Sequence, residues 1–323
     1  MHEGIERTCG YPNLQTSGGG TGPGIPPCRV LALEGSFVRA AREIQSIIQQ
    51  DPGDRGLARW AIGEQLLPAA TSLSAAGHCL ICTGFFIPTA GVIETDGPPG
   101  TIVLAQALLA SNQPVTILTD RHAEEIIQAG LDIVDCSAEL LAFSEGDRID
   151  YADVVTLHTT HFVAVERPGP AADGFHYNFK GEIITEYLAP LDRLFAASVS
   201  GASVTIGIGD GGNELGMGNV APTVDSLHSP GPPYACVVPS DFCICAGVSN
   251  WGAYGLAALL SVVCHRNLLL SPDSLSRILS EIVRAGAVDG ITARQEVTVD
   301  NLPPWWEDHV YRALYRTVEK YCS

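Results

Sequence analysis

The segment TIGIGDGGNELGMGNV, residues 205–220, places two carboxylates and two amides on a glycine-rich turn directly behind a β-branched run. Asp210 and Glu214 could accept protons or ligate a divalent cation through their carboxylate oxygens, and Asn213 adds an amide oxygen. Aspartate and asparagine also favour turns without any ligand, which is the alternative interpretation. The turn therefore predicts acid–base chemistry, or a metal ion held by Asp210, Asn213 and Glu214.

A second acidic motif, ETDGPPGT, leads into an expected helix. Glu94 and Asp96 lie just before its Pro/Gly turn, and the free N–H groups at a helix N-terminus attract carboxylate or phosphate groups. We expect Glu94 and Asp96 to be catalytic candidates together with the two carboxylates of the glycine-rich turn. The helix after Pro98 is expected to hold a substrate carboxylate. Acidic residues are also favourable there without any ligand.

Cations for an anionic substrate are expected in the loop VERPGPAADGFHYNFKGE, in which Arg167 and Lys180 could pair with carboxylates. Lysine is scarce, because only Lys180 and Lys320 occur in the chain. A solvated loop lysine is the alternative, since most lysines are exposed. In AGVSNWGAYG, Ser249 or Asn250 could cap a helix, and capping alone would explain both. The candidate substrate-binding residues are Thr101, Arg167, Asn178, Lys180, Gly211, Gly212, Asn213, Ser249 and Asn250.

Two familiar motifs are only partly matched by the glycine-rich turn. GIGDGG has the letters of a dinucleotide fingerprint, but the following residues are too rich in glycine and proline for the helix that such a fingerprint requires. GDGGNE resembles a metal-binding segment of haloacid dehalogenase-like phosphatases. Glu94 stands where the nucleophilic aspartate of that family belongs, so an aspartyl-nucleophile mechanism is not favoured.

From His78 onward, short apolar runs alternate with amphipathic segments. This rhythm predicts an α/β fold with a mainly parallel, doubly wound, Rossmann-like sheet and helices on both faces. The ligand is then expected beyond the carboxyl ends of the strands, where the polar loops described above lie. The expected strands are 78–87, 115–119, 131–134, 153–158, 203–209 and 242–248. The expected helices are 37–48, 57–67, 101–110, 123–129 (ended by Gly130), 191–198, 251–264, 275–285 and 306–321.

Composition limits the classes of function. Eighteen Lys and Arg against 36 Asp and Glu give a net charge of −18, which repels nucleic acid and anionic lipid. No apolar run of about 18 residues is present to span a membrane, so we expect neither a nucleic-acid nor a membrane partner. The Gly/Pro-rich residues 1–28 are expected to be a flexible tail, and residues 29–323 a single α/β catalytic domain. The oligomeric state is not indicated.

Ten cysteines make up a small part of this long chain and lie mostly inside apolar runs, so we expect reduced core thiols. Cys79 and Cys82 have CxxC spacing, but an odd offset in a strand points the two side chains to opposite faces. His158 and His161 meet the same objection. A zinc site built from these four residues is therefore not favoured.

Four segments together resemble a known family: TGFFIPTAGVIETDGPPGT, VERPGPAADGFHYNFKGE, IGDGGNELGMGNV and CAGVSNWGAYGLAALL. In this order and spacing they are similar to the C-terminal catalytic domain of the D-glutamate cyclase family of mitochondrial proteins. The resemblance runs from about Val30 onward. It implies an α/β hydro-lyase that converts D-glutamate into 5-oxo-D-proline and water in the mitochondrial matrix. Longer members carry a hydratase-like N-terminal region and a transit segment, and we expect neither here.

Such a cyclisation needs a base for the ammonium proton, an acid for the departing oxygen, and donors or a cation for the oxyanion. Asp210 or Glu214 would be the base, or would hold a divalent ion that polarises the γ-carboxylate. Arg167, Lys180 and the helix after Pro98 would hold the substrate carboxylates. The sequence requires no cofactor, with a divalent cation as the alternative. A metal-dependent phosphatase-like enzyme and a non-catalytic small-molecule binding protein are the other candidate functions.

Overall fold

The fold is that of a computed structural model, described for residues 27–56, 61–156, 158–199, 201, 203–228 and 234–323. The tail expected at 1–28 lies outside these residues except for its last two, which begin helix α1 (Pro27–Ile48). No helix within the described ranges has both the length and the apolar character that crossing a bilayer demands.

Six strands of the described chain form one parallel sheet with the spatial order β5-β4-β1-β6-β7-β8. Numbered along the chain, this order reads 3-2-1-4-5-6, which is the order of dinucleotide-binding α/β folds. The expected doubly wound, mainly parallel fold is therefore confirmed. The strands are β1 (His78–Thr83), β4 (Val115–Asp120), β5 (Glu139–Phe143), β6 (Thr159–Val165), β7 (Val204–Gly209) and β8 (Phe242–Cys245).

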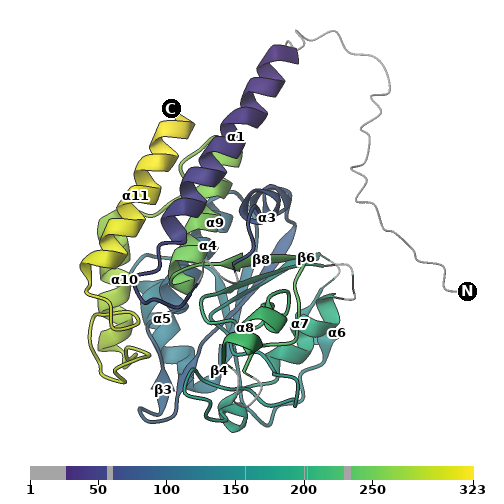
Figure 1. Cartoon of the computed structure of the whole chain (residues 1–323), viewed down its shortest axis with the longest axis vertical. Coiled ribbons are helices and arrows are strands. Elements are labelled where there is room, and N and C mark those ends of the chain that lie inside the picture. The colour runs from purple at the N-terminus through teal and green to yellow at the C-terminus, as the bar shows by residue number, and fades with distance from the viewer. Residues whose placement is uncertain (1–26, 57–60, 157, 200, 202, 229–233) are drawn as a thin grey trace, which may run out of the picture.

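Helices cover both faces of the sheet. Successive side chains of a strand point to opposite faces, and apolar strand residues on each face pack against these helices. Along β1, Cys79 and Ile81 pack into the larger core with α1, α3 (Leu66–Leu73), α4 (Pro98–Ala110), α5 (Glu124–Asp132), α9 (Ser249–Val263), α10 (Pro272–Arg284) and α11 (Trp305–Cys322). Leu80 and Cys82 pack on the other side with α6 (Tyr151–Val154) and α7 (Leu191–Val199). Figure 1 shows α1 and α11 side by side at the outer edge of the larger layer.

The loops at the carboxyl ends of the strands are long and carry small elements of their own. A two-stranded hairpin of β2 (Phe86–Ile87) and β3 (Val92–Ile93) lies between β1 and α4. Short 3₁₀ turns, η1 (Arg121–Ala123) and η2 (Thr185–Tyr187), follow β4 and β6. Helix α8 (Ala221–His228) follows the glycine-rich turn after β7. Strands β1 and β6 meet where the strand order reverses, so the crevice expected for a ligand opens there.

Gly130 does not end a helix, as the sequence had indicated, because α5 continues to Asp132. A Cβ placed on Gly130 would lie 2.5 Å from Ile102 Cδ1 and 2.9 Å from Ile282 Cγ2. This glycine therefore allows close packing between helices. The strand expected at 131–134 is wrong for the same reason, and the edge strand β5 takes its place.

Two further expected elements differ from the structure. The strand expected at 153–158 is wrong in its described residues, where α6 ends at Val154 and β6 begins only at Thr159. Of the helix expected at 57–67, residues 57–60 lie outside the described chain, 61–65 form a loop, and α3 begins at Leu66. For 153–158, the short run suited either kind of element.

Among the side chains that the structure describes, the eight cysteines from Cys79 to Cys322 are free thiols. Cys79 and Cys82 belong to the cores on opposite faces of the sheet, as their spacing predicts. Burial raises the pKa of Cys82 to about 12 and raises the pKa of Cys79 as well. Both side chains therefore stay protonated and apolar at neutral pH.

We predict that Cys79→Ser and Cys82→Ser each lower the free energy of unfolding by about 1–3 kcal/mol, because a buried hydroxyl is less well tolerated than a thiol. Urea unfolding at pH 7 under reducing conditions measures this. Cys264→Ser, at a partly exposed thiol, is the control and should change stability less. Stoichiometric zinc that is lost in the double variant would contradict the structural role.

Candidate active site

One pocket gathers the polar side chains at the carboxyl ends of β1, β6 and β7. It has about 330 Å³ of empty space, part of it open to solvent. The loops after these three strands are joined there by the loop between α1 and α3 and the loop between α10 and α11. The lining residues are Arg55, Phe85, Ile87, Glu94, Glu166, Phe179, Asp210, Asn213, Glu214, Tyr234, Gly290, Ile291 and Asp300.

The glycine-rich turn after β7 is wrapped around the carboxylate of Glu214. The backbone N–H groups of Asp210, Gly211 and Gly212 donate to Glu214 at 3.1, 2.6 and 2.7 Å. Gly207 lies against the backbone of Gly216, since a Cβ on Gly207 would lie 2.7 Å from the Gly216 carbonyl. Glu214 therefore fixes the conformation of the turn. Close backbone contacts within the turn leave no room for a side chain at Gly207, whether or not a ligand binds.

Asp210 is the buried carboxylate that this turn presents to the pocket. Its Oδ1 accepts a hydrogen bond from Arg55 Nη1 at 2.9 Å, whereas Oδ2 has no hydrogen-bond partner among the described residues. Burial raises the pKa of Asp210 well above its usual value, and the charge of Arg55 opposes that rise. Asp210 thus combines an ion pair on one oxygen with an open acceptor on the other.

Glu94 and Glu166 are the other two acidic groups with strongly raised pKa values in this pocket. Burial is the main cause for both, and the neighbouring carboxylates add to it. Ser249 Oγ donates to Glu166 at 2.5 Å, and the carboxylate of Glu94 packs directly on Gly290. Glu166 has a φ of 45°, a strained backbone conformation that often occurs at functional sites. Both groups are suited to donate protons near neutral pH.

Asp96 lies beside the pocket and caps a helix. It accepts hydrogen bonds from the N–H groups of Ser249 at 2.9 Å and Asn250 at 2.7 Å, which begin α9. In return, Asn250 Oδ1 accepts from Gly97 N at 3.0 Å and Gly100 N at 2.8 Å, which begin α4. The helix N-terminus after Pro98, expected to bind a substrate carboxylate, is therefore already occupied by Asn250.

The cations expected in the loop after β6 lie outside the pocket lining. Arg167 is fully buried, pairs with Asp120 through both of its terminal nitrogens, and donates to Ala189 O at 2.8 Å. Lys180 is exposed, and its Nζ lies 5.3 Å from the ring centroid of Phe179, which lines the pocket. The guanidinium of Arg167 is thus occupied by partners within the protein, whereas the ammonium group of Lys180 is accessible to a ligand.

Three more predicted binding residues have internal partners or none. Asn178 closes its own turn, because its Oδ1 accepts from the backbone N–H groups of Lys180 and Glu182. Asn213 lines the pocket and donates to Tyr177 O at 2.8 Å. Thr101 is buried in α4 and does not line the pocket.

Nine of the lining residues were not among the predicted site residues, and four of these nine carry ionisable side chains: Arg55, Glu166, Tyr234 and Asp300. Glu166 directly follows a strand, which is a signal that strand-end reasoning could have used. Arg55 and Asp300 come from loops at the two ends of the domain, and only the folded structure brings them together. Burial raises the pKa of Tyr234 well above its usual value, so its hydroxyl stays a donor at neutral pH.

Two overlapping groups of carboxylates could hold a divalent cation. They are Asp96, Asp210 and Asp300, and Glu166, Asp210 and Glu214, each with one oxygen per residue within 4.8 Å of the others. Oxygen ligands suit Mg²⁺, Mn²⁺ or Ca²⁺. However, Arg55 occupies one oxygen of Asp210, and backbone N–H groups occupy those of Asp96 and Glu214. A cation would have to displace or share these contacts.

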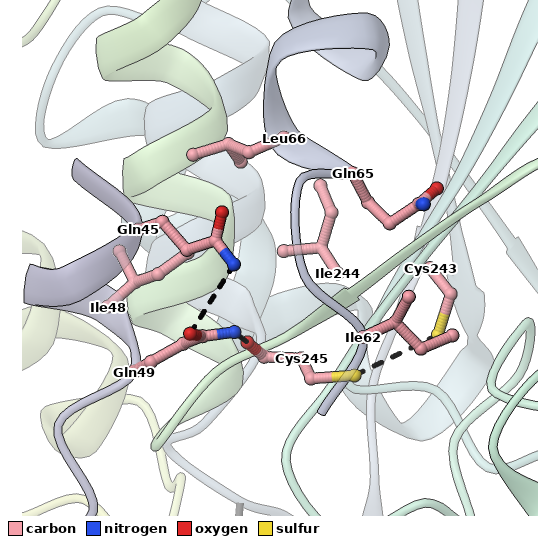
Figure 2. A pocket seen from close by; sticks show the side chains of 9 residues that line it. All are labelled: Gln45, Ile48, Gln49, Ile62, Gln65, Leu66, Cys243, Ile244 and Cys245. Atoms are coloured by element: carbon pink, nitrogen blue, oxygen red, sulfur yellow. Dashed lines mark hydrogen bonds between the residues drawn. The ribbon is translucent and has the colours of Figure 1, made fainter. Parts of the chain in front are cut away.

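A second pocket lies between α1, α3 and β8 and has about 190 Å³ of empty space. Figure 2 shows three glutamine side chains, apolar residues and two thiols around it, with Gln49 donating to Cys245 O at 3.4 Å. The thiols of Cys243 and Cys245 lie 4.0 Å apart. Among the described residues that line it there is no carboxylate, histidine, lysine or arginine, so this part of the lining lacks the acid–base groups of the first pocket.

Comparison with known proteins identifies the family of the chain. The chain is 39% identical over 242 residues to "D-glutamate cyclase, mitochondrial" of Homo sapiens. That match covers 69% of this chain and 39% of the human protein, so the chain spans well under two thirds of that relative's length. Residues 44–314 match the family described as "D-glutamate cyclase-like, C-terminal". The chain therefore belongs to the D-glutamate cyclase-like, C-terminal family.

Proposed function

We propose that the chain is a hydro-lyase that cyclises D-glutamate to 5-oxo-D-proline and water. The observation that carries the proposal is the pocket itself. There Asp210 forms an ion pair with Arg55 and lies among buried carboxyl groups that have raised pKa values. Different environments for neighbouring carboxyl groups allow one to act as a base and another as an acid. The family membership supplies the substrate, since the human relative is named for this activity.

The reaction is balanced in protons. The substrate nitrogen begins as an ammonium group and ends as a lactam N–H, so it loses two protons. The γ-carboxylate loses one oxygen as water, and that oxygen gains two protons. The carbon–nitrogen bond forms as the carbon–oxygen bond breaks, and no external oxidant, reductant or nucleotide is needed. The pocket has only to move protons and to hold the nitrogen about 3 Å from the γ-carbon.

Asp210 is the base in this proposal, because its Oδ2 is an open acceptor inside the pocket. Glu214 is less suited, since both of its oxygens already accept backbone N–H groups. Glu166 and Glu94, held protonated by burial, donate to the γ-carboxyl group, which is a poor electrophile while it is ionised. Glu166 and Asp210 have oxygens within 4.8 Å of one another, so a single water could return the proton between them.

The substrate carboxylates need different partners. The γ-carboxyl group would enter the acidic interior and be bound in protonated form. The α-carboxylate would stay near the mouth, where Lys180 is exposed beside Phe179, a residue of the pocket lining. The roles first expected for Arg167 and the α4 N-terminus pass in this proposal to Lys180 alone. Mitochondrial matrix residence is also proposed, on the strength of the human relative's name.

The alternatives differ in what the pocket would have to hold. Among the described residues that line it, Arg55 is the only arginine or lysine, and five lining residues are acidic, which disfavours a phosphate ester. Glu94 follows the β2–β3 hairpin instead of a sheet strand, so it is poorly placed to replace the nucleophile of a phosphatase. A non-catalytic binding protein would be stabilised by D-glutamate or 5-oxoproline without turnover.

We predict that the purified protein converts D-glutamate to 5-oxoproline without ATP or NAD. D-Glutamate and L-glutamate are incubated separately, with and without EDTA, and the product is followed by chiral chromatography. Turnover lost with EDTA and restored by Mg²⁺ or Mn²⁺ would assign the carboxylates to a cation. A strict need for a nucleotide, or phosphate release from phosphoesters in place of cyclisation, would overturn the proposal.

We predict that Asp210→Asn lowers kcat at least about a hundredfold, because the amide cannot take the ammonium proton. The fold should persist, since asparagine is nearly isosteric. Steady-state kinetics with D-glutamate and a thermal melt of the same preparation check both statements. Asp273→Asn, at a side chain that is 90% exposed on α10, is the matched control and should keep normal kcat. Near-normal kcat in Asp210→Asn would remove this residue from the mechanism.

We predict that Glu94→Gln makes the protein more stable at alkaline pH while lowering its turnover. Because burial raises the folded-state pKa of Glu94 above the unfolded value of about 4.3, the wild type loses stability as the pH rises between the two values. Glutamine removes this loss, so the variant should gain in urea midpoint at pH 8 and gain little at pH 4. Glu125→Gln, at an exposed position of α5, is the control. An equal gain at both pH values would contradict the raised pKa.

A further inference from the structure

Arg55 reaches the pocket from a part of the chain that carries no sheet strand. It lies in the loop that follows α1, and the carboxylate of Asp51 fixes that loop by accepting from Arg55 N at 2.8 Å and Gly56 N at 2.9 Å. The loop therefore holds the arginine backbone in one place. Because the side chain is only 22% exposed, its charge acts inside the pocket and not in bulk water.

The two ends of the guanidinium group bind two different loops. Nη1 lies 2.9 Å from Asp210 Oδ1, and Nη2 lies 2.8 Å from Asp300 Oδ2. The carboxylate side chains are 2% and 7% exposed. Asp300 has a φ of 54°, so its backbone is strained in the position from which it reaches Arg55. A fork-shaped guanidinium suits such a bridge, whereas a lysine could not bind both carboxylates in this way.

We propose that Asp300, Arg55 and Asp210 form a positioning chain, in which Asp300 fixes the guanidinium and Arg55 holds Asp210 Oδ1, so that Asp210 Oδ2 stays open to the substrate. This inference rests on the proposed function, because it concerns the base of that reaction. Arg55 is a positioning residue here, since it acts through Asp210 and does not itself transfer a proton.

The carboxylates that face Asp210 oppose its ionisation. Glu166 contributes from the loop after β6, Asp96 from the loop before α4, and Asp300 from the loop between α10 and α11. Glu214 of the same turn and the hydroxyl of Tyr234 also face the pocket. Burial and these carboxylates raise the pKa of Asp210, and Arg55 is the nearby cation that lowers it. Removal of Arg55 should therefore raise the pKa of Asp210 further and favour its protonated form.

The first test is the pH profile of kcat/KM for D-glutamate in wild type and Arg55→Gln. An opposite charge at this distance shifts a carboxyl pKa by about one to three pH units, so the acid limb should move to higher pH by at least about one unit. At pH 7 kcat should fall at least about tenfold and recover partly at pH 9. Arg55→Lys should retain part of the activity, and Asp300→Asn should shift the limb in the same direction.

Arg42→Gln is the matched control, because Arg42 carries the same charge on nearby α1 but pairs with Glu64 at the surface, where the side chains are 71% and 79% exposed. It should leave the profile unchanged. A merely structural role for Arg55 would lower activity equally at every pH. A role in binding a substrate carboxylate would raise KM with the acid limb unmoved. Either result would overturn the proposal.

The second test needs no turnover and so separates this inference from the proposed reaction. Urea unfolding of wild type, Arg55→Gln, Asp210→Asn and the double variant gives the coupling between the two residues. The coupling should be favourable at pH 8 and should weaken as the pH falls, because protonation of Asp210 removes the charge that pairs with Arg55. Coupling in a protein that does not cyclise D-glutamate would sustain the ion pair and reject the reaction. No coupling at pH 8 would reject the chain of residues whatever the reaction.

Discussion

The reciprocal capping of α4 and α9 is the interaction on which the site depends. Asp96 satisfies the first N–H groups of α9, and Asn250 satisfies those of α4, so each helix supplies the other's cap. A Cβ on Gly100 would lie 2.9 Å from Asn250 Cα, which shows how closely the two helices approach. Ser249, the first residue of α9, donates a hydrogen bond from its hydroxyl to the carboxylate of Glu166. The positions of the pocket carboxylates thus depend on the contact between the N-termini of α4 and α9. The side chains of Asn250 and Asp96 already occupy N–H groups at both N-termini.

The electrostatics of the pocket follow from this arrangement. With both helix N-termini capped and Arg167 bound to Asp120, the acidic lining is balanced mainly by the single guanidinium of Arg55. Buried carboxyl groups without an adequate cation keep their protons, and this is why Glu94 and Glu166 have raised pKa values. The same imbalance that costs stability supplies protonated acids beside an ion-paired carboxylate. Such a combination suits a dehydration in which protons move between two ends of one small substrate.

The alternation of short apolar runs and amphipathic segments was enough to predict the parallel sheet and the edge at which the site lies. It failed where tertiary packing decides, as at Gly130, which fits between isoleucines inside the helical layer. The sequence indicated which charged residues could act in a site, but it did not indicate which partner each of them would bind. Arg167 was expected to bind substrate, but Asp120, 47 positions away in the sequence, takes its guanidinium. Arg55 and Asp300 lie 245 positions apart (300 minus 55), and no local pattern relates them.

The route by which Arg55 enters the pocket has a wider consequence. Its loop continues from α1, which packs through Ile44 and Ile48 into the core that also contains α9 and α11. If α1 and this loop move together, the docking of α1 is coupled to the ion pairs that Arg55 makes with Asp210 and Asp300. By reciprocity, a positively charged ligand that competes with Arg55 for the two aspartates would weaken the packing of α1 against the core. The packing of the first helix would in that case belong to the same equilibrium as the charge of the pocket.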